Sequence, residues 1–487
     1  MATAVLKAAA AATLLLAAAP SGQDRPQAAS ACPLLAIRIA PGASLSRAVE
    51  AAPPGAGFCI VSGLHRMQSA QPKDGQRFSG EPGAVLSGAA ILTDFTYSGG
   101  VWASAAPRDP GPERGMCLPG YEACGWPEIV FLDGEPLRQV ADRSQLRPGS
   151  FFHDRQRRQF LLADAPEGRL VEITAARYAL FGTARNVAIR GLTIEKYANP
   201  AQEGAIRGDG PGWRIEDSEF RLNSGAGVSV GPRGAVLRSK IHHNGQIGAT
   251  ADGSDILFEG NAIWANNRYG FDPEWDAGGI KITESRNVTF RDNDVHHNDG
   301  PGLWCDERCE NVTFEGNRVA YNSAAGIFFE LSSKAVIRGN RLWQNNQAGK
   351  SWYWGAEILI AASEEAAVHD NVLVVRDPGR AIMLIDQNRW KVGGGFYKTR
   401  GNRVTDNDIT FLGRGAAGGV SVSDQAAANF AIIERGGNLF DRNVYRVPPG
   451  SPAPRFVWGT LETDFAGFRA RGQEGGGSLT GVASPPR

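Results

Sequence analysis

The chain has 487 residues, and its 51 basic and 51 acidic side chains give a formal net charge of zero. No basic stripe or basic amphipathic segment interrupts this balance, so neither nucleic acid nor a membrane surface is expected as a partner. The 61 glycines favour a chain with many turns.

The N-terminus has the pattern of a secretory signal. Lys7 precedes the apolar run 8–19, which ends in small residues before Pro20. The run is too short for a membrane span. We therefore expect a signal peptide over residues 1–20, a linker over 21–31, and a protein secreted to the periplasm or the extracellular space.

The six cysteines fit such an oxidising compartment. They fall in three pairs, which are Cys32 with Cys59, Cys117 with Cys124, and Cys305 with Cys309. The first pair flanks a helical segment and could fasten an N-terminal cap, the second lies in one Gly- and Pro-rich loop and could pair, and the third brackets one turn. No Cys-x-x-Cys pair occurs, so we expect no metal on these thiols.

Residues 32–99 are expected to form an N-terminal cap and the first coils of a larger structure. Residues 44–52 have helical spacing with a serine start, and Pro53 ends the helix. Such a helix would cover an open sheet edge, which is otherwise a template for aggregation. Residues 100–180 are expected to form a small β insertion, because residues 130–137 have the pattern of a hairpin with an Asp-Gly turn.

From residue 181 to 447, short alternating strands repeat with an asparagine at the end of each copy. Four of these are Asn261, Asn293, Asn317 and Asn340, so that neighbouring copies lie 32, 24 and 23 residues apart. A period in the twenties without helical patterns indicates a parallel β-helix solenoid, in which each coil buries its inward residues by stacking on the next. The asparagine columns are expected to be structural and to bond one coil to the next.

Two segments lie outside this repeat. The longest interval holds an insertion over residues 267–276, which we expect to rise beside the solenoid. Residues 448–487 are expected to form a C-terminal segment that docks on the final coil, followed by a loose tail from Gly472.

The second strand of each coil carries the candidate chemistry. Side chains alternate in a strand, and the second and fourth members of each copy are apolar, so the third and fifth members face outward. The third members form a column with Lys281, Trp304 and Phe328. The fifth members form a column that includes Asp306 and Glu330. Coils stack about 4.8 Å apart, so these two carboxylates should be neighbours.

Two neighbouring carboxylates suit acid–base chemistry. They cannot both ionise easily, so one pKa should rise and supply a general acid beside a base or nucleophile. We therefore predict Asp306, Glu330 and Lys281 as catalytic residues, with Lys281 orienting one carboxylate or binding an acidic sugar.

Further residues are predicted to bind a substrate, and no metal ligands are assigned. Trp304 and Phe328 could stack on a sugar ring. The insertion before Lys281 and a second insertion near residue 352 could form two walls of a cleft. The remaining candidates come from these walls and from nearby turns, and they are Glu274, Trp275, Asp276, His296, Arg308 and Trp354.

Several of these segments resemble the secreted right-handed parallel β-helix proteins of the pectin-lyase-like superfamily. The similar segments are the cap helix, the repeats, and the strands 278–281, 302–306 and 326–330. The resemblance implies an all-β, right-handed parallel β-helix that acts on polysaccharides as a lyase, a glycoside hydrolase or a uronate epimerase. Two motifs of that superfamily are missing from the sequence, namely the calcium cluster of pectate lyases with its arginine motif, and the Asn-Thr-Asp and Asp-Asp motifs of polygalacturonase-type hydrolases.

Three functions follow as expectations. The leading one is a secreted, monomeric glycoside hydrolase that uses Asp306 and Glu330; no cofactor is assigned, and Ca²⁺ stays open. The second is a lyase or C5-epimerase on uronic acids, in which Lys281, Arg308 or a histidine removes a proton and the two carboxylates hold Ca²⁺. The third is a non-catalytic, glycan-binding solenoid. The concentration of carboxylates and aromatic residues between 272 and 354 favours an enzyme.

Overall fold

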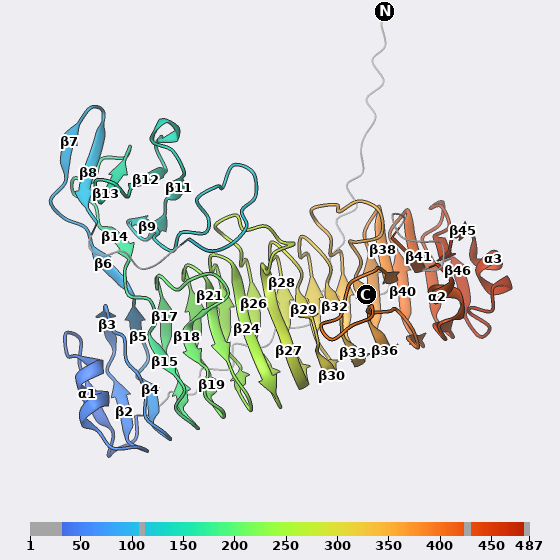
Figure 1. The fold of residues 1–487 in the computed structure, drawn as a ribbon, viewed down its shortest axis with the longest axis horizontal. Helices are drawn as coiled ribbons and strands as arrows, with labels where there is room; N and C mark the ends of the chain where they lie inside the picture. Colours follow the sequence, from blue (N-terminus) through green and yellow to red (C-terminus); the bar gives the residue numbers. More distant parts are fainter. Residues whose placement is uncertain (1–31, 107–112, 423–429, 482–487) are drawn as a thin grey trace, which may run out of the picture.

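The computed structural model describes residues 32–106, 113–422 and 430–481. The expected signal peptide at 1–20 and linker at 21–31 lie outside these residues. Figure 1 shows one elongated solenoid of stacked strands, with a smaller group of strands projecting near its N-terminal end. No helix among the described residues is long and apolar enough to cross a membrane.

Each complete coil supplies one strand to each of three faces. The site face, named for the side chains described below, consists of parallel strands β15 (Leu180–Gly182), β18 (Gly204–Gly208), β21 (Ala226–Val230), β24 (Ile247–Ser254), the first part of β27 (Gly278–Arg291), β29 (Leu303–Asp306), β32 (Ile327–Glu330), β35 (Ile358–Ala361), β38 (Gly379–Asp386), β41 (Gly415–Ser421) and β44 (Arg455–Gly459).

The other two faces are also parallel. The second face contains β1 (Ile37–Ile39), β2 (Gly57–Ile60), β4 (Arg77–Gly80), β16 (Ala188–Arg190), β19 (Arg214–Glu216), β22 (Ala235–Leu237), β25 (Leu257–Glu259), the end of β27, β30 (Glu310–Glu315), β33 (Ser333–Arg338), β36 (Glu364–His369), β39 (Arg403–Thr405) and β42 (Leu439–Asp441). The third face contains β3 (Gly63–Arg66), β5 (Ala84–Ser87), β17 (Thr193–Glu195), β20 (Glu219–Arg221), β23 (Lys240–His242), β26 (Ala262–Trp264), β28 (Asp294–His296), β31 (Arg318–Ala320), β34 (Arg341–Trp343), β37 (Val372–Val375), β40 (Asp408–Phe411), β43 (Val444–Val447) and β46 (Ser478–Gly481).

The projecting group is a β module with its own core. Its strands are β6 (Ala89–Ile91), β7 (Thr96–Ser98), β8 (Val101–Ala105), β9 (Val130–Leu132), β10 (Glu135–Pro136), β11 (Arg138–Val140), β12 (Ser150–Asp154), β13 (Gln159–Leu162) and β14 (Val171–Thr174), with one 3-10 turn at Arg143–Gln145. They form two small sheets around Val130, Phe151, Phe160 and Ile173. The antiparallel pairing of β9 with β10 confirms the hairpin. The strands of the module begin at Ala89, ahead of the boundary expected at residue 100.

Two ladders of buried asparagines join the coils. In the first, the Asn317 amide donates to Asn340 Oδ1 at 2.9 Å and accepts from the Asn293 amide at 2.9 Å. It also donates to the Phe290 carbonyl at 2.9 Å. A second ladder runs along the neighbouring turns through Asn298 and its equivalents. The expectation that these columns are structural is therefore confirmed.

The N-terminal end is closed by helix α1 (Leu45–Ala51). Ser44 caps it by accepting a hydrogen bond from the Arg47 N–H, and Leu45 and Val49 are buried in the solenoid core. The expected cap helix is thus confirmed, and Figure 1 shows it beyond the first strands of the stack.

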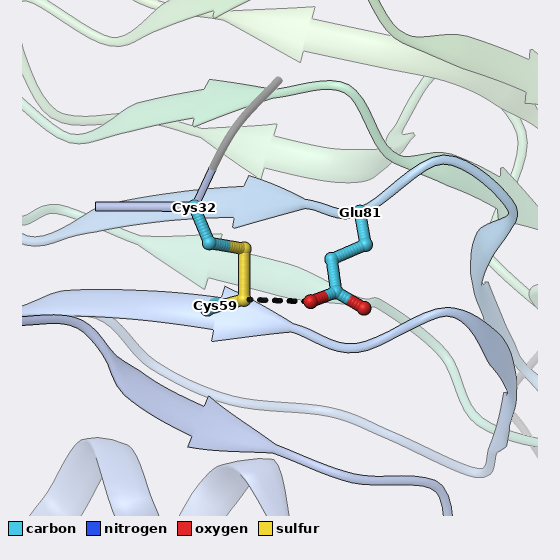
Figure 2. Close-up of side chains that lie close together, drawn as sticks. All are labelled: Cys32, Cys59 and Glu81. Carbon is cyan, nitrogen blue, oxygen red and sulfur yellow. Dashed lines mark hydrogen bonds between the residues drawn. A yellow bond between two sulfur atoms is a disulfide. The ribbon is translucent and has the colours of Figure 1, made fainter. Parts of the chain in front are cut away.

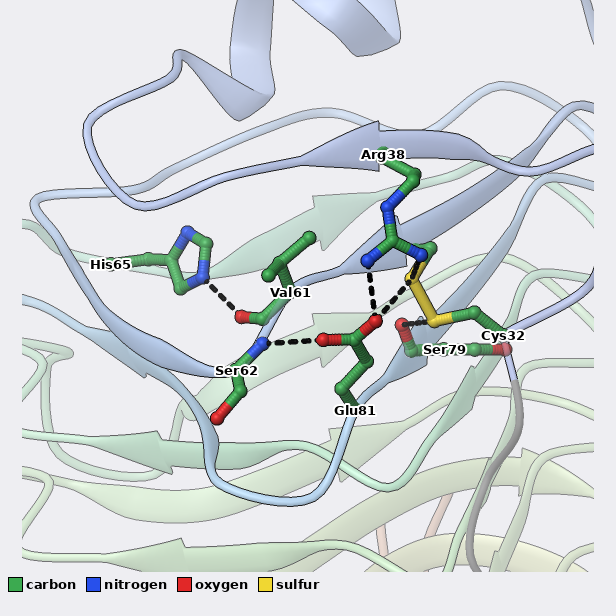
Figure 3. The surroundings of a disulfide bond; sticks show 8 residues. Cys32, Arg38, Val61, Ser62, His65, Ser79 and Glu81 are labelled. Carbon is green, nitrogen blue, oxygen red and sulfur yellow. Dashed lines mark hydrogen bonds and ion pairs between the residues drawn. A yellow bond between two sulfur atoms is a disulfide. The ribbon is translucent and has the colours of Figure 1, made fainter.

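A disulfide between Cys32 and Cys59 fastens this end, as the cysteine spacing predicted. Figure 2 shows the Glu81 carboxylate beside the Cys59 sulfur. In Figure 3, Arg38 reaches the same carboxylate, with 2.6 Å between Nη2 and Oε1, and the Ser62 N–H donates to its other oxygen at 3.0 Å. The segment before the helix is therefore held by both a covalent bond and an ion pair.

The remaining cysteines also match the expected pairs in part. Cys117 and Cys124 form the second disulfide within their loop. Cys305 and Cys309 are buried free thiols at one turn of the solenoid.

The C-terminal end differs from the expectation. Strands β44 and β46 extend the site face and the third face beyond residue 447, and they are accompanied by α2 (Phe430–Arg435), β45 (Leu461–Thr463) and α3 (Phe465–Ala470). The tail expected to be loose from Gly472 instead forms β46, and its buried Glu474 accepts a hydrogen bond from Asn443 at 2.7 Å. The carboxylate ends the asparagine ladder, a role that the Gly-rich composition of the segment does not reveal.

Replacing Asn317 with alanine should destabilise the solenoid. The change leaves the Asn293 amide and the Phe290 carbonyl without their buried partner. We expect the free energy of unfolding to fall by about 2–4 kcal/mol, since each buried unsatisfied group costs about 1–3 kcal/mol. Chemical denaturation followed by circular dichroism would measure it. Arg318→Ala, at the adjacent exposed position, should change stability by no more than about 0.5 kcal/mol. Equal effects of the two changes would contradict a structural role for the ladder.

Candidate active site

The two predicted columns exist on the site face. Lys281 pairs with Trp304, and Trp304 pairs with Phe328, in the strand register from β27 to β32. In the neighbouring column Thr283 pairs with Asp306, and Glu330 follows Phe329 at the equivalent place of the next strand. Residues between them, such as Ile282 and Cys305, point into the core. Strand alternation therefore placed every one of these side chains on the correct side of the coil.

Lys281 is the centre of the cluster. Its Nζ lies 2.8 Å from Asp306 Oδ2 and also contacts Asp276 Oδ1. The residue is only 8 % exposed. Burial lowers the pKa of Lys281, but the charges of Asp306 and Asp276 outweigh it and raise that pKa above its ordinary value. Lys281 is therefore a fixed cation that holds one oxygen of Asp306.

Glu330 is the carboxyl with the raised pKa. It is 7 % exposed and lies in the coil after Asp306. Burial, and then the charge of Asp306, raise the pKa of Glu330 to about 8 against the opposing effects of Arg389 and Lys281. Gln387 Nε2 donates to Glu330 Oε1 at 3.5 Å, and Arg389 Nη1 lies 3.6 Å from the same oxygen. This raised pKa has the direction expected for one of two neighbouring carboxyls.

One carboxylate oxygen of this cluster lacks a partner. Asp306 Oδ1 is buried and has no hydrogen-bond partner among the described residues, whereas the Trp304 indole interacts with Glu330 and lowers its pKa. Buried polar groups are normally paired, so an unpaired oxygen is a candidate for contact with a ligand. Asp306 thus has one oxygen held by Lys281 and one oxygen free.

Trp304 does not have the orientation predicted for it. The Lys281 ammonium lies 3.7 Å from the centre of its ring, and the Phe328 ring stacks with it at 5.3 Å. Because these neighbours come from the preceding and following coils, both ring faces are covered and only the ring edge can reach a ligand. The side chain is 5 % exposed. The prediction that a sugar stacks on Trp304 is therefore wrong for this arrangement, whereas Phe328 is half-buried and lines the depression.

The predicted walls meet over this cluster. Glu274, from the first insertion, lies 2.9 Å from Lys350 Nζ, which belongs to the second. Together with Trp354 they border a depression of about 370 Å³ that also exposes Phe328 and Glu330. This depression contains five of the residues predicted from the sequence, which are Glu274, Trp304, Phe328, Glu330 and Trp354.

Four predicted binding residues do not line this depression, and of these Asp276 contacts Lys281 and lines a neighbouring cavity. Trp275 packs against Phe271 in the cluster that surrounds the Cys117–Cys124 disulfide. Arg308 forms an ion pair with Glu284 of the preceding coil, and it lines a different depression. His296 lies on the third face, where it stacks with Trp264 at 6.1 Å. The repeat pattern shows which coil contains each of these residues. It does not show on which face of the solenoid a loop or turn residue lies.

Other contributors were not predicted. Gln387 and Arg389 follow strand β38 directly, and the change from an apolar strand to polar residues at 386–389 was a usable signal. Gln202 donates to Asp276 Oδ2 and so supports the Asp276–Lys281–Asp306 arrangement. Arg114, from the loop of the β module, contacts Gln202 in turn. Nothing in the local sequence around Arg114 and Gln202 indicates these long-range contacts.

The cluster does not suit calcium. Calcium takes six to eight oxygen ligands, but here the Lys281 ammonium occupies the space between Asp276 and Asp306. Among the described residues, three donor atoms approach one another closely enough to share an ion only at Cys32, Cys59 and Glu81 (Figure 2), and those sulfurs form a disulfide. Ca²⁺ was expected on Asp306 and Glu330, and Lys281 already occupies one oxygen of Asp306.

Comparison with known proteins supports the architecture. A family model described as right handed beta helix region matches residues 204–364. No curated protein matches the chain. A solved structure of XylC in complex with xylose has a TM-score of 0.59 and 12 % sequence identity, covering 91 % of this chain and 83 % of that one. The A-module of the mannuronan C-5 epimerase AlgE6 from Azotobacter vinelandii has a TM-score of 0.49 and 15 % identity, covering 91 % and 93 %.

At such identities the similarity is one of fold. The strand stacking, the asparagine ladders and the matched family model agree with one another. The chain therefore has the right-handed parallel β-helix fold of the pectin-lyase-like proteins.

Proposed function

We propose that the protein is a secreted polysaccharide-active enzyme and specifically a glycoside hydrolase. The observation that carries the proposal is the pairing of unlike carboxyls, since Glu330 has a pKa raised to about 8 and its neighbour Asp306 is held by Lys281. Glycoside hydrolysis needs one carboxyl that gives a proton and one carboxylate that attacks or activates water. The two disulfides support a secreted protein.

Glu330 would be the general acid. Burial keeps its proton at neutral pH, and its place in the depression lets it reach the oxygen of a glycosidic bond. Gln387 and Arg389 would orient the carboxyl. Arg389 would also favour the carboxylate that forms once the proton has left.

Asp306 would be the base or nucleophile. Lys281 fixes one of its oxygens and leaves Oδ1 without a partner, so Oδ1 would be the atom that acts on water or on the sugar. Phe328 and Trp354 would supply the apolar surface of the binding site. XylC was solved with xylose, and a sugar ligand for this chain is part of the present proposal.

A lyase or epimerase that used Lys281 as its base is less consistent with this geometry. A base must give up its proton before it acts, whereas Asp306 and Asp276 raise the pKa of Lys281. The glycan-binding alternative would leave the paired carboxyls without a role. Both alternatives give results in the assay below that differ from hydrolysis.

Glu330→Gln and Asp306→Asn should each abolish hydrolysis. The purified protein is first incubated with neutral and uronic-acid polysaccharides, with reducing ends and the ultraviolet absorbance of unsaturated uronates read together. On a glycan that is cleaved, each variant should lose about 100- to 10,000-fold in kcat. Glu315→Gln removes a carboxyl on the second face and is the matched control. New absorbance, or full activity in either variant, would contradict the assignment.

The rate should depend on the Glu330 proton. Because Glu330 must be protonated to act and its pKa is about 8, kcat/KM should fall as the pH rises through about 8. A pH–rate profile measured on the cleaved glycan tests this. An alkaline limb that begins below pH 6 would be inconsistent with Glu330 as the acid.

Stability gives an independent test of the same proton. The folded state raises the pKa of Glu330 from 4.5 to about 8, so its protonated form contributes stability that is complete below about pH 4.5 and is lost as the pH rises through about 8. Glu330→Gln cannot lose a proton. We therefore expect its melting temperature, relative to the parent protein, to rise between pH 5 and pH 9, as followed by thermal unfolding in matched buffers. A constant difference would mean that the carboxyl is not buried in its neutral form.

A further inference from the structure

A second cavity lies on the N-terminal side of the proposed catalytic pair. The columns that contain Lys281 and Asp306 extend through three earlier coils, where Arg207 pairs with Ser229, Ser229 with Thr250, and Thr250 with Lys281. These side chains form the floor of a cavity of about 330 Å³. A volume of this size is within the range of ligand-binding pockets, which begins near about 300 Å³.

Small side chains create this cavity. Ser229, Gly231, Thr250 and Thr283 line it, at places where the C-terminal coils carry the larger Trp304, Phe328 and Glu330. The floor from the coil of Arg207 to that of Lys281 covers three coil steps, or about 14 Å at about 4.8 Å per step. The groove is therefore long in the direction of the solenoid axis, as a glycan chain requires.

The N-terminal end of the cavity is bordered by a group of ion pairs. Arg207 lies 2.8 Å from Glu203 and 3.1 Å from Asp209, and Arg114 of the β module lies 3.4 Å from Glu203. The β module thus contributes one wall of the cavity. The opposite end meets Lys281, which pairs with both Asp276 and Asp306, and Glu330 lines the depression in the C-terminal direction from there.

The charges of the cavity indicate the ligand class. Its three cations, Arg114, Arg207 and Lys281, are each paired with carboxylates of the protein. Asp252 adds a further carboxyl that forms no ion pair within the described part of the chain, and burial followed by the charge of Asp209 raises its pKa. An anionic sugar would find no free cation and an excess of acids. Hydroxyls, in contrast, could bond to Thr250, Thr283 and Asp252.

We propose that this cavity is a second sugar-binding region that receives an uncharged glycan chain, with the bond to be cleaved lying between it and the Glu330 depression. The inference rests on the proposed function and names the substrate class of the same site. It predicts that the enzyme prefers longer chains, because sugars beyond the cleaved bond gain contacts with the cavity.

Filling the cavity should remove this preference. Thr250→Phe places a ring at the middle of the floor, and Thr313→Phe introduces the same ring on the second face as a control. Oligosaccharide ladders of increasing length from glucan, xylan and mannan are compared with an oligogalacturonate ladder. We expect the ratio of kcat/KM for the longest over the shortest neutral oligosaccharide to fall about tenfold in Thr250→Phe, as for the loss of about 1.4 kcal/mol of binding free energy. The ratio should not change in Thr313→Phe.

Calorimetric binding of the same ladders to Glu330→Gln, with and without Thr250→Phe, separates this inference from the proposed function. Hydrolysis without a preference for longer chains would contradict the sugar-binding role of the cavity but not the hydrolase proposal. A preference for longer chains that persists in Thr250→Phe would have the same meaning. A further outcome is that neutral oligosaccharides bind without being cleaved by the parent protein, and that Thr250→Phe weakens this binding. This result would support the sugar-binding role of the cavity and contradict the hydrolase proposal. Tighter binding of the oligogalacturonates than of every neutral ladder would overturn the uncharged class.

Discussion

The whole molecule depends on the hydrogen-bonded stacking of one coil on the next. Backbone ladders fix the spacing on three faces, and buried amides such as Asn293 and Asn317 repeat it at the turns, where the backbone alone would leave polar groups unpaired. This spacing places Asp306 and Glu330 on neighbouring strands, and it stacks Lys281, Trp304 and Phe328 in register. The neighbours of each side chain in the site are therefore set by the distance between coils. That distance is fixed by the ladders and not by the residues of the site.

Burial then makes the two carboxyls unlike. On a bare strand both would be solvated, but the walls around Glu274 and Lys350 cover the cluster. Lys281 lies against Asp306, whereas Glu330 is in the less compensated position, with its amide and guanidinium neighbours at 3.5 and 3.6 Å. One acid is thereby held in an ion pair, and burial raises the pKa of the other. A solvated corner residue would show neither property.

The extent to which sequence predicts this protein depends on the range of the contacts. Alternation within a strand and the regular repeat are local, and they were sufficient for the fold, the columns and the neighbouring carboxyls. The covering of both faces of Trp304 could not be predicted, because it requires knowing how closely Lys281 and Phe328 approach the ring. The places of His296 and Arg308 depend on how each turn is directed, and the contact between Arg114 and Gln202 joins segments far apart in the chain. The strand at 478–481 was missed because its pairing partner, β43, is the only indication of it.

The insertions change coil length without changing the ladder. The Asn261 amide donates to Asn293 across 32 residues at 3.0 Å, and the Asn293 amide donates to Asn317 across 24 residues at 2.9 Å. The extra residues of the longer coil therefore leave the ladder unchanged and form the wall around Glu274 and the cluster around Phe271 and Trp275. In such an architecture, loops between strands can lengthen, shorten or change sequence while the strand spacing between Asp306 and Glu330 stays the same. Asp276 is the exception, because it ends the insertion and contacts Lys281, so a change in this loop reaches the carboxyl pair through that ion pair.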